Sequence, residues 1–486
     1  MNRRRFMKNA MLTGLVYGVG GLPTFINESS AAFQSLGSKR VLLNLMLEGG
    51  PDLRHFIVPE YSANTNSFGY HYWRNRTRAH GISNTASAMQ NHWNNQFDHR
   101  SHNGITFGIA KTCGWFTQMW DAGHVAIINN AYSIDSRAHD HATLVMNQGN
   151  RNSEAGQLNR SGWGGRLAVS AGENAIGLTH IPSRFCFGPD GSNINAVDNS
   201  HLISVANSRS IGFHEFNHAE NARYERRQDQ AARAAKSYYK SLHAQLPNDS
   251  IYQRFLEHET KIRYFGDLIQ QRLATVPIPP RIEALYESNV VGINNPSALL
   301  FRRNFGEQIR NAYDTLASHD LLDARVLSME LSGWDTHGDQ AEDINENLED
   351  VFGADKGLSA LWQALELDAG TNVNRENLVM LIAGEFGRQL RDNGGNGTDH
   401  GEGNMMFMIG EKVTGGLYGD LFPEAEIDRI QDQDISTPDI LGLTQIDQHF
   451  GSLCDWVVSG SSGVVFPDRA NAQIEQVGMF SNLFHV

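Results

Sequence analysis

The chain is poor in cysteine, with three among its 486 residues: Cys113, Cys186 and Cys454. Three widely spaced cysteines allow at most one disulfide, which excludes a small fold stapled by disulfide bonds. They also lack the paired C-x-x-C spacing of structural zinc sites. The length exceeds the usual size of a single hydrophobic core, so we expect one large domain with insertions, or two domains.

Positive charge and long apolar runs are scarce as well. The chain has 40 basic against 54 acidic residues, for a formal net charge of −14. Such an acidic chain is a poor candidate for binding nucleic acid, which favours basic surfaces. The longest apolar stretch, residues 10–25, falls short of the ~20 residues that a membrane span needs, and no transmembrane segment is predicted.

The N-terminus has the three-part layout of a targeting segment. Arg3 and Arg4 lie in a polar-Arg-Arg-x-Phe-x-Lys context, and a modestly apolar stretch rich in small residues follows. Ser30, Ala31 and Ala32 then offer small residues to a signal peptidase. This pattern predicts a twin-arginine signal peptide over residues 1–32, export by the twin-arginine translocase and a periplasmic or secreted location. The alternative is a basic N-terminus beside a short buried helix.

Short apolar runs recur along the rest of the chain, most with turn-forming residues directly behind them. Runs of four to eight apolar residues are typical of fully buried strands in a parallel sheet. Helical spacing lies between them, as at Ile344, Leu348, Val351 and Phe352. We therefore predict an α/β fold with a mainly parallel sheet, occupying residues 38–486. The predicted strands lie in residues 41–47, 125–128, 326–331, 378–383 and 405–409.

Two regions interrupt this alternation. Residues 61–105 are rich in Asn, His and aromatic residues and are predicted to form a long, partly irregular insertion. Residues 215–275 are charged and strongly helical in pattern, which predicts a helical insertion within the domain. The aromatic residues of the first region either anchor it to the domain or stack on sugars; they are Tyr70, Tyr72, Trp73 and Trp93.

Carboxylates and imidazoles follow the predicted strands. Ligands of open α/β sheets bind where the strands end, so side chains from distant strands meet there. Carboxylates and imidazoles gathered in one place repel each other or lose hydration unless a cation joins them. A mixed Asp/His set suits zinc or manganese better than calcium. Each residue also has a structural alternative, as a turn former, an N-cap, a loop residue or an ion-pair partner. The candidates are Asp52, Asp335, His337, Glu385, Asp399 and His400.

Five short motifs extend this pattern over nearly the whole chain. They are Leu47–Asp52 (LEGGPD), Ser161–Arg166 (SGWGGR), Gly333–His337 (GWDTH), Gly384–Arg388 (GEFGR) and Gly397–Gly401 (GTDHG). In content and order they resemble the DUF1501 family of twin-arginine-exported bacterial proteins, which is related to the alkaline phosphatase and sulfatase superfamily.

The resemblance implies a three-layer α/β/α sandwich of the alkaline phosphatase type with divalent metal at the strand ends. Carried over by motif, Asp52, Asp399 and His400 would hold one ion, and Asp335 and His337 a second. The resemblance further implies that Glu385 positions a ligand and that Arg388 clamps an anion bidentately.

The sequence departs from the family pattern at the expected nucleophile. Where the family shows Arg-Ser-His at the start of a helix, this chain has Arg137, Ala138 and His139, so the serine is missing and His139 remains as the catalytic candidate. Glu402 stands where the family often has histidine, and His449 is the positional candidate for a last metal histidine.

Two functional hypotheses remain open at this point. The first is an exported metal-dependent hydrolase acting on phosphate or sulfate esters, small anionic substrates whose charge the metal would neutralise. The second is a non-catalytic metal-binding or partner-binding protein that has lost its nucleophile. The missing serine favours the second, and the retained acidic and imidazole residues favour the first.

Overall fold

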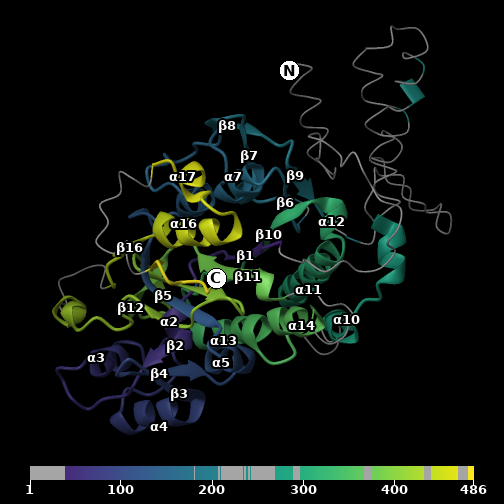
Figure 1. Ribbon diagram of the computed structural model, residues 1–486. Helices are drawn as coiled ribbons and strands as arrows, with labels where there is room; N and C mark the ends of the chain where they lie inside the picture. Colours follow the sequence, from purple (N-terminus) through teal and green to yellow (C-terminus); the bar gives the residue numbers. More distant parts are fainter. Residues whose placement is uncertain are drawn as a thin grey trace.

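The computed structural model describes residues 39–179, 181–205, 269–287, 296–365, 375–431, 439–468 and 480–485, together with a few isolated positions between 208 and 241 (Figure 1). The predicted signal peptide and most of the predicted 215–275 insertion lie outside these residues. No helix among the described residues is long and apolar enough to cross a membrane.

A nine-stranded sheet forms the centre of the molecule. Its main path runs β15-β5-β14-β11-β1-β10-β6-β9, with β16 paired to β5. Neighbouring strands are parallel except β14, which is antiparallel to both β11 and β5. Every strand predicted from an apolar run is present, so the mainly parallel α/β fold is confirmed. The strands are β1 Val41–Leu47, β5 Val125–Tyr132, β6 Asn174–Gly177, β9 Leu202–Ser204, β10 Ala324–Leu331, β11 Leu378–Gly384, β14 Asn404–Ile409, β15 Gly416–Tyr418 and β16 Thr444–Gln445.

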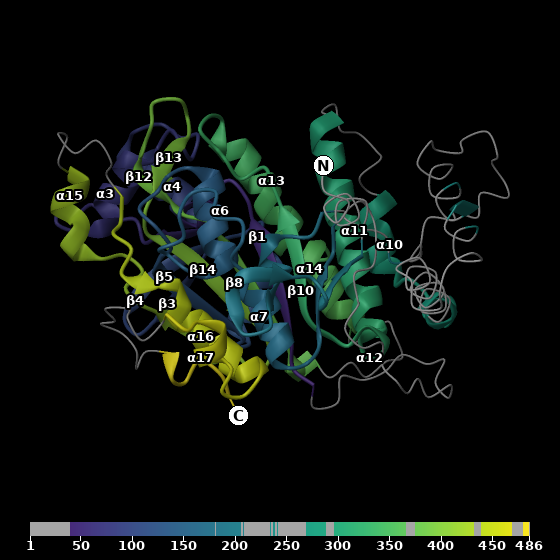
Figure 2. The same ribbon diagram turned by 90° about the horizontal axis from the view of Figure 1, so that it is seen from above.

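Each face of the sheet carries its own hydrophobic core, because alternate side chains of a strand point to opposite faces. In β1, Leu43 and Leu45 join one core, whereas Leu42 and Met46 join the other. Helices cover both faces (Figures 1 and 2). One layer holds α5 Gly114–Asp121, α10 Pro280–Glu287, α11 Pro296–Ala317, α12 His319–Leu322, α13 Gln340–Phe352 and α14 Gly357–Gln363; the other holds α6 His139–Gln148, α7 Trp163–Ser170, α16 Ile446–Val457 and α17 Ser462–Val465.

The region of residues 61–105 is more regular than the sequence predicts. It contains two helices, and its last strand joins a three-stranded antiparallel sheet in the order β2-β4-β3. Tyr72, Trp73 and Trp93 are buried in the core, so these rings anchor the region and present no face to a sugar. The elements between residues 53 and 110, which include this region, are α2 Leu53–Phe56, β2 Ile57–Pro59, α3 Phe68–Asn75, α4 Ala86–Gln96, β3 Phe97–His102 and β4 Ile105–Ala110.

Two hairpins and several short elements complete the described chain. The hairpin of β12 Gly387–Asp392 and β13 Thr398–Gly401 follows β11 directly and lies at the candidate site. The remaining elements are β7 Gly188–Asp190, β8 Asn193–Asp198, α15 Ile427–Gln431 and the 3-10 turns Arg184–Cys186, Arg375–Asn377 and Glu424–Glu426. All three cysteines are buried and free, so the possible disulfide does not form.

Buried histidines are part of the core. His449 of α16 is fully buried against the rings of Phe450 and Phe480, so it belongs to the core and not to the strand-end site for which the sequence made it a candidate. His55 stacks on His80 with ring centroids 4.1 Å apart, and both are buried. Burial lowers the pKa of His55 and of His449 to about 3.

These shifts predict an acid-sensitive fold. A histidine that stays neutral in the folded protein but takes up a proton near pH 6.5 when unfolded favours the unfolded state as pH falls from about 6.5 toward 3. We expect the free energy of unfolding to fall by about 2 kcal/mol per such histidine between pH 7 and pH 5. Urea titrations of wild type and His449→Phe measure this, and the variant should lose less stability on acidification. Equal losses in both proteins would contradict the assignment.

Candidate functional site

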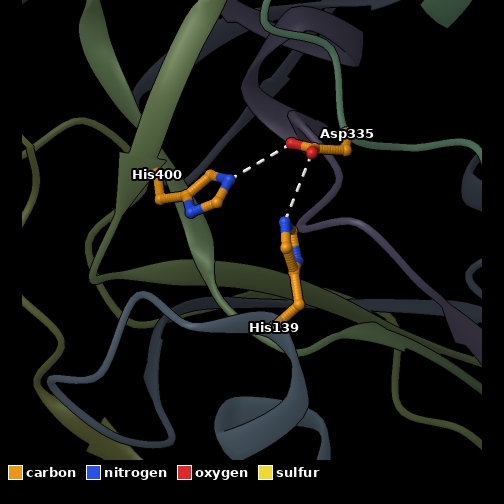
Figure 3. Close-up of side chains that lie close together, drawn as sticks. All are labelled: His139, Asp335 and His400. Atoms are coloured by element: carbon orange, nitrogen blue, oxygen red, sulfur yellow. Dashed lines mark hydrogen bonds and ion pairs between the residues drawn. The ribbon is translucent and has the colours of Figure 1, made fainter.

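The loops that follow the parallel strands meet at one edge of the sheet, as the carboxyl ends of parallel strands must. Asp335 lies in the loop after β10, Glu385 directly follows β11, and His139 begins α6 after β5. His400 comes from β13 of the neighbouring hairpin. Figure 3 shows His139 and His400 approaching the carboxylate of Asp335 from different elements.

Three histidines point the same ring nitrogen at this carboxylate. The Nε2 atoms of His337 and His400 each lie 3.1 Å from Oδ1 of Asp335, and Nε2 of His139 lies 3.3 Å from Oδ2. The Nε2 atoms of His337 and His400 are 2.9 Å apart. The four side chains therefore form one cluster, which is called the His-Asp cluster below.

The opposite nitrogen of each ring is held by an acceptor. Nδ1 of His139 lies 2.8 Å from a carboxylate oxygen of Glu385, and Nδ1 of His337 lies 3.0 Å from one of Asp399. Nδ1 of His400 lies 2.8 Å from the carbonyl oxygen of Arg137. A carbonyl or carboxylate oxygen only accepts, so each Nδ1 carries a proton, and in the neutral form of a ring the lone pair of Nε2 faces Asp335.

With its rings neutral, the His-Asp cluster is a set of acceptors that face each other. Burial raises the pKa of Asp335, but the hydrogen bond and charge of Arg388, together with the neighbouring histidines, outweigh burial and bring the pKa to about 2, so the carboxylate is ionised. Three lone pairs and a carboxylate at 2.9–3.3 Å repel unless protons or a cation lie among them. One ligand atom each from His139, Asp335 and His400 lies within 4.8 Å of the others, so the group could hold a metal ion.

The pattern behind the rings supports that fit. Histidines that bind metal almost always donate the other ring nitrogen to a carboxylate or a carbonyl, which fixes the tautomer and the ring orientation. Phe386 adds a packing restraint, with its ring centroid 5.0 Å from that of His139 and 4.5 Å from that of His400. The imidazoles are therefore oriented before any ligand binds.

Arg388 joins the loops that carry the cluster. Its guanidinium donates to the backbone carbonyls of Gly49, Gly50 and Thr398 and to Asp335 at 2.5 Å, and the side chain is buried. Burial lowers the pKa of Arg388, with Asp335 and Glu385 partly opposing that effect. The geometry therefore makes Arg388 a positioning residue, since no exposed fork remains to clamp an anion as the sequence suggested.

Gly49 is required by the same close approach. Its φ is +120°, and a Cβ there would lie 2.4 Å from the backbone nitrogen of Asp335. Its backbone N–H donates to Glu385 at 2.9 Å, so the loop after β1 also orients the acceptor of His139. The Gly-Gly pair of the LEGGPD motif is explained by close packing, Gly49 against the loop after β10 and Gly50 against the ring of Phe386.

The carboxylate of Asp52 pairs with residues outside this cluster. Its carboxylate forms a buried ion pair with Arg76 and accepts a hydrogen bond of 2.6 Å from Gln340. The side-chain oxygen of Gln340 accepts from Thr336 and Thr398, which precede His337 and Asp399 in their loops. Asp52 therefore supports the two loops from beneath, and the sequence gave no sign of Gln340 as the link.

The structure regroups the residues predicted from the sequence. His337, His400 and Asp335 come together as expected at the strand ends, and His139 joins them in place of Asp52 and Asp399. Asp399 lies behind His337, outside the cluster, and its carboxylate accepts hydrogen bonds from His337 and Asn393. The sequence offers His139 as a catalytic candidate, and its position at the start of α6 brings it to the His-Asp cluster.

A groove opens from the cluster to solvent. It is lined by Glu48, Gly49, His139, Asp140, Thr143, Ser332, Gly333, Asp335 and Glu385. Its side chains are mostly acidic, and Thr143 and Ser332 are the hydroxyls on its walls. Ala138 occupies the N-cap of α6, and Ser136 uses its hydroxyl on the backbone N–H of Ala138. Position 138, where the family pattern has serine, therefore offers no hydroxyl to the groove.

The buried position of Asp52 generates a test that separates support from metal binding. The Asp52→Asn variant leaves Arg76 buried without its counter-charge and should lose about 3–5 kcal/mol of unfolding free energy. The exposed pair of Arg100 and Asp121 is the matched control, and Asp121→Asn should cost about 0–1 kcal/mol. Denaturant titrations measure both. An unchanged stability in Asp52→Asn, together with lost metal affinity, would show instead that Asp52 is a ligand.

Comparison with known proteins bears on the second half of the chain. Residues 291–444 match the family described as "Protein of unknown function (DUF1501)". The matched region contains Asp335, His337, Glu385, Arg388, Asp399 and His400, whereas His139 and Asp52 precede it. The chain matches no curated protein. The match to residues 291–444 therefore supports the DUF1501 family for this chain.

Proposed function

We propose that this protein is an exported metal-dependent hydrolase of the alkaline phosphatase superfamily type, with a divalent ion held by His139, His337, His400 and Asp335. One observation carries the proposal: three Nε2 atoms converge on one ionised carboxylate while an acceptor holds each Nδ1. A core histidine needs no such arrangement, and a metal site does. The donor set suits zinc or manganese.

The reaction follows from the groove beside the cluster. A bound divalent ion supplies Lewis-acid activation of water and neutralises charge on an ester oxygen. The chain contributes orientation, because Glu385 and Asp399 fix two of the imidazoles. It also contributes a proton-transfer group: burial, followed by the charge of Glu385, raises the pKa of Glu48. A glutamate whose pKa is raised above its usual value is better suited to donate a proton to a leaving group.

With Ala138 in place of serine, water is the nucleophile that fits this site. Thr143 lies one turn further along α6 and lines the groove, but no described base accepts its proton at hydrogen-bond distance. A one-step hydrolysis without a covalent intermediate therefore agrees with the residues present better than the two-step route of a serine enzyme.

The charge of the groove restricts the ester. Glu48, Asp140, Asp335 and Glu385 line it, and Arg388 is buried behind it. With Glu48 protonated as the proton donor, three carboxylates remain; a metal ion offsets about two of these charges, and a dianionic phosphate monoester would still face the third. Of the phosphate and sulfate esters that the resemblance suggests, we therefore propose those with a single negative charge, namely sulfate esters and phosphodiesters.

A second function remains for comparison, and the missing serine is the observation that favours it. In that alternative the protein is exported by the twin-arginine pathway, keeps the metal and binds a partner without turnover. Both functions require the ion, so metal binding is tested first and hydrolysis second.

Metal affinity should depend on the cluster and on the groups behind it. We expect His400→Ala to lower the affinity for zinc and manganese by ~10-fold or more, and Asp399→Ala to lower it by ~10-fold through the loss of the acceptor of His337. The matched control is His141→Ala, because His141 lies two residues beyond His139 and points its Nε2 at the carbonyl of Ser153. Calorimetric titration into chelator-stripped protein measures all four proteins. Equal affinities in His400→Ala and wild type would end the metal-site proposal.

Hydrolysis should favour singly charged esters. We expect metal-loaded protein to release nitrophenolate from 4-nitrophenyl sulfate or bis(4-nitrophenyl) phosphate with a kcat/KM about tenfold or more above that for 4-nitrophenyl phosphate. One extra charge ~8 Å from a carboxylate costs about 2 kcal/mol at an effective dielectric constant of about 20. Activity should disappear in His400→Ala. Full metal occupancy with no turnover of any of the three esters would leave the binding protein as the function.

A further inference from the structure

The acidic groove continues along α6 into a second hollow of different character. Asp140 and Thr143 line both, so the two hollows share a wall. Beyond these residues the lining is mixed, and it adds the apolar side chains that the first hollow lacks: Leu144, Leu158, Ile181 and Pro182 stand beside Asn147, Ser183, Arg184 and Glu330. The surface therefore changes from mostly carboxylates at the His-Asp cluster to a hollow with substantial hydrocarbon in its walls.

The apolar end is exposed to an unusual degree. Five large apolar side chains are strongly exposed among the described residues, and two of them, Ile181 at 80% and Leu158 at 53%, lie in this hollow. Single exposed apolar residues need no explanation, but two that face one hollow beside a candidate reaction site point to a ligand.

The walls of this hollow are fixed by the fold. Arg184 donates from Nη1 to the carbonyl oxygen of Leu158 at 2.7 Å and holds its guanidinium over the ring of Phe187. The bond ties the loop of Leu158 to the turn after Ile181, so both apolar side chains stand on connected backbone. One donor of Arg184 is thereby engaged in the wall of the hollow.

The floor adds little charge. Glu330, near the end of β10, lines the hollow, and burial raises its pKa to about 7. A carboxyl group that is about half protonated at neutral pH carries less charge than an ordinary glutamate, which lowers the desolvation cost of placing a hydrocarbon ligand beside it.

We propose that this hollow, formed by Leu144, Leu158, Ile181 and Pro182, binds the apolar alkyl or aryl part of an ester whose charged group lies at the His-Asp cluster. This proposal rests on the proposed function and names its substrate class: amphipathic monoanionic esters. The short polar passage past Asp140 and Thr143 separates the two ends, so a long apolar group reaches the hollow and a methyl group does not.

Alkanesulfonates test the proposal without turnover, since their carbon–sulfur bond is not hydrolysed and each carries one negative charge. Octanesulfonate and methanesulfonate are titrated calorimetrically into the purified, metal-loaded mature protein. We expect octanesulfonate to bind ~10-fold or more tightly than methanesulfonate, since each buried methylene favours binding. Ile181→Asp and Leu158→Asp should reduce the affinity for octanesulfonate to that for methanesulfonate, and should leave the latter unchanged.

Val464→Asp is the matched control, because Val464 is a 63% exposed apolar residue on α17, outside this hollow. Ile181 and Leu158 are also exposed, so neither change removes core packing, and circular dichroism verifies the fold. Equal affinities for the two sulfonates in wild type, or a chain-length preference that survives in both hollow variants, overturns the proposal. A preference abolished in those variants, with no ester hydrolysed, supports the hollow and refutes only the hydrolase.

Discussion

The ion pair between Arg388 and Asp335 is the interaction on which the site depends. A single buried guanidinium gathers the loop after β1, the loop after β10 and the β12–β13 hairpin by donating to Gly49, Gly50, Thr398 and Asp335. These segments are far apart in the sequence, and a charged group in the interior is tolerated only with this degree of pairing. The low pKa of Asp335 follows from the same contact, and with it the permanent negative charge that the histidines face.

The site therefore separates two tasks that carboxylates perform at strand ends. Asp52 forms an ion pair with Arg76 and accepts a hydrogen bond from Gln340. It therefore stabilises the loops that carry His337 and Asp399. Asp335 is also paired, but its second oxygen and the three imidazoles leave lone pairs directed into one space. Glu385 and Asp399 lie behind the imidazoles and determine which ring nitrogen is available. Supporting and binding carboxylates differ here only in their neighbours.

The surroundings of the cluster connect its chemistry to a substrate. Acidic walls disfavour a multiply charged anion, and an apolar hollow next to them favours hydrocarbon. Ala138 precedes α6 without a hydroxyl and leaves His139 in position, since the backbone of that turn orients the imidazole whatever side chain precedes it. In the hydrolase that we propose, water is therefore the attacking group.

The sequence alone determined the fold class and the edge of the sheet at which chemistry-bearing residues gather. Continuous apolar runs mark β1, β10, β11 and β14 because strands buried on both faces admit few polar residues. The same logic led from the apolar runs to Asp335, His337 and Glu385, which follow β10 and β11, whereas His400 lies within the β12–β13 hairpin. Neither pattern depends on contacts between distant residues, and each could be read from local composition.

Only the tertiary structure decided which of those residues meet. Asp52 follows β1 as predicted, yet its carboxylate forms an ion pair with Arg76, directly after α3. No spacing in the sequence indicates that pair. Asp399 and His400 are adjacent in β13, so the strand turns their side chains to opposite sides, and Asp399 holds His337 from behind while His400 faces Asp335. His139 enters the cluster because α6 begins at the end of β5. The direction of a side chain and its partners are set by packing between segments hundreds of residues apart. The sequence therefore indicates the region of the site, whereas the tertiary structure determines which residues contact each other there.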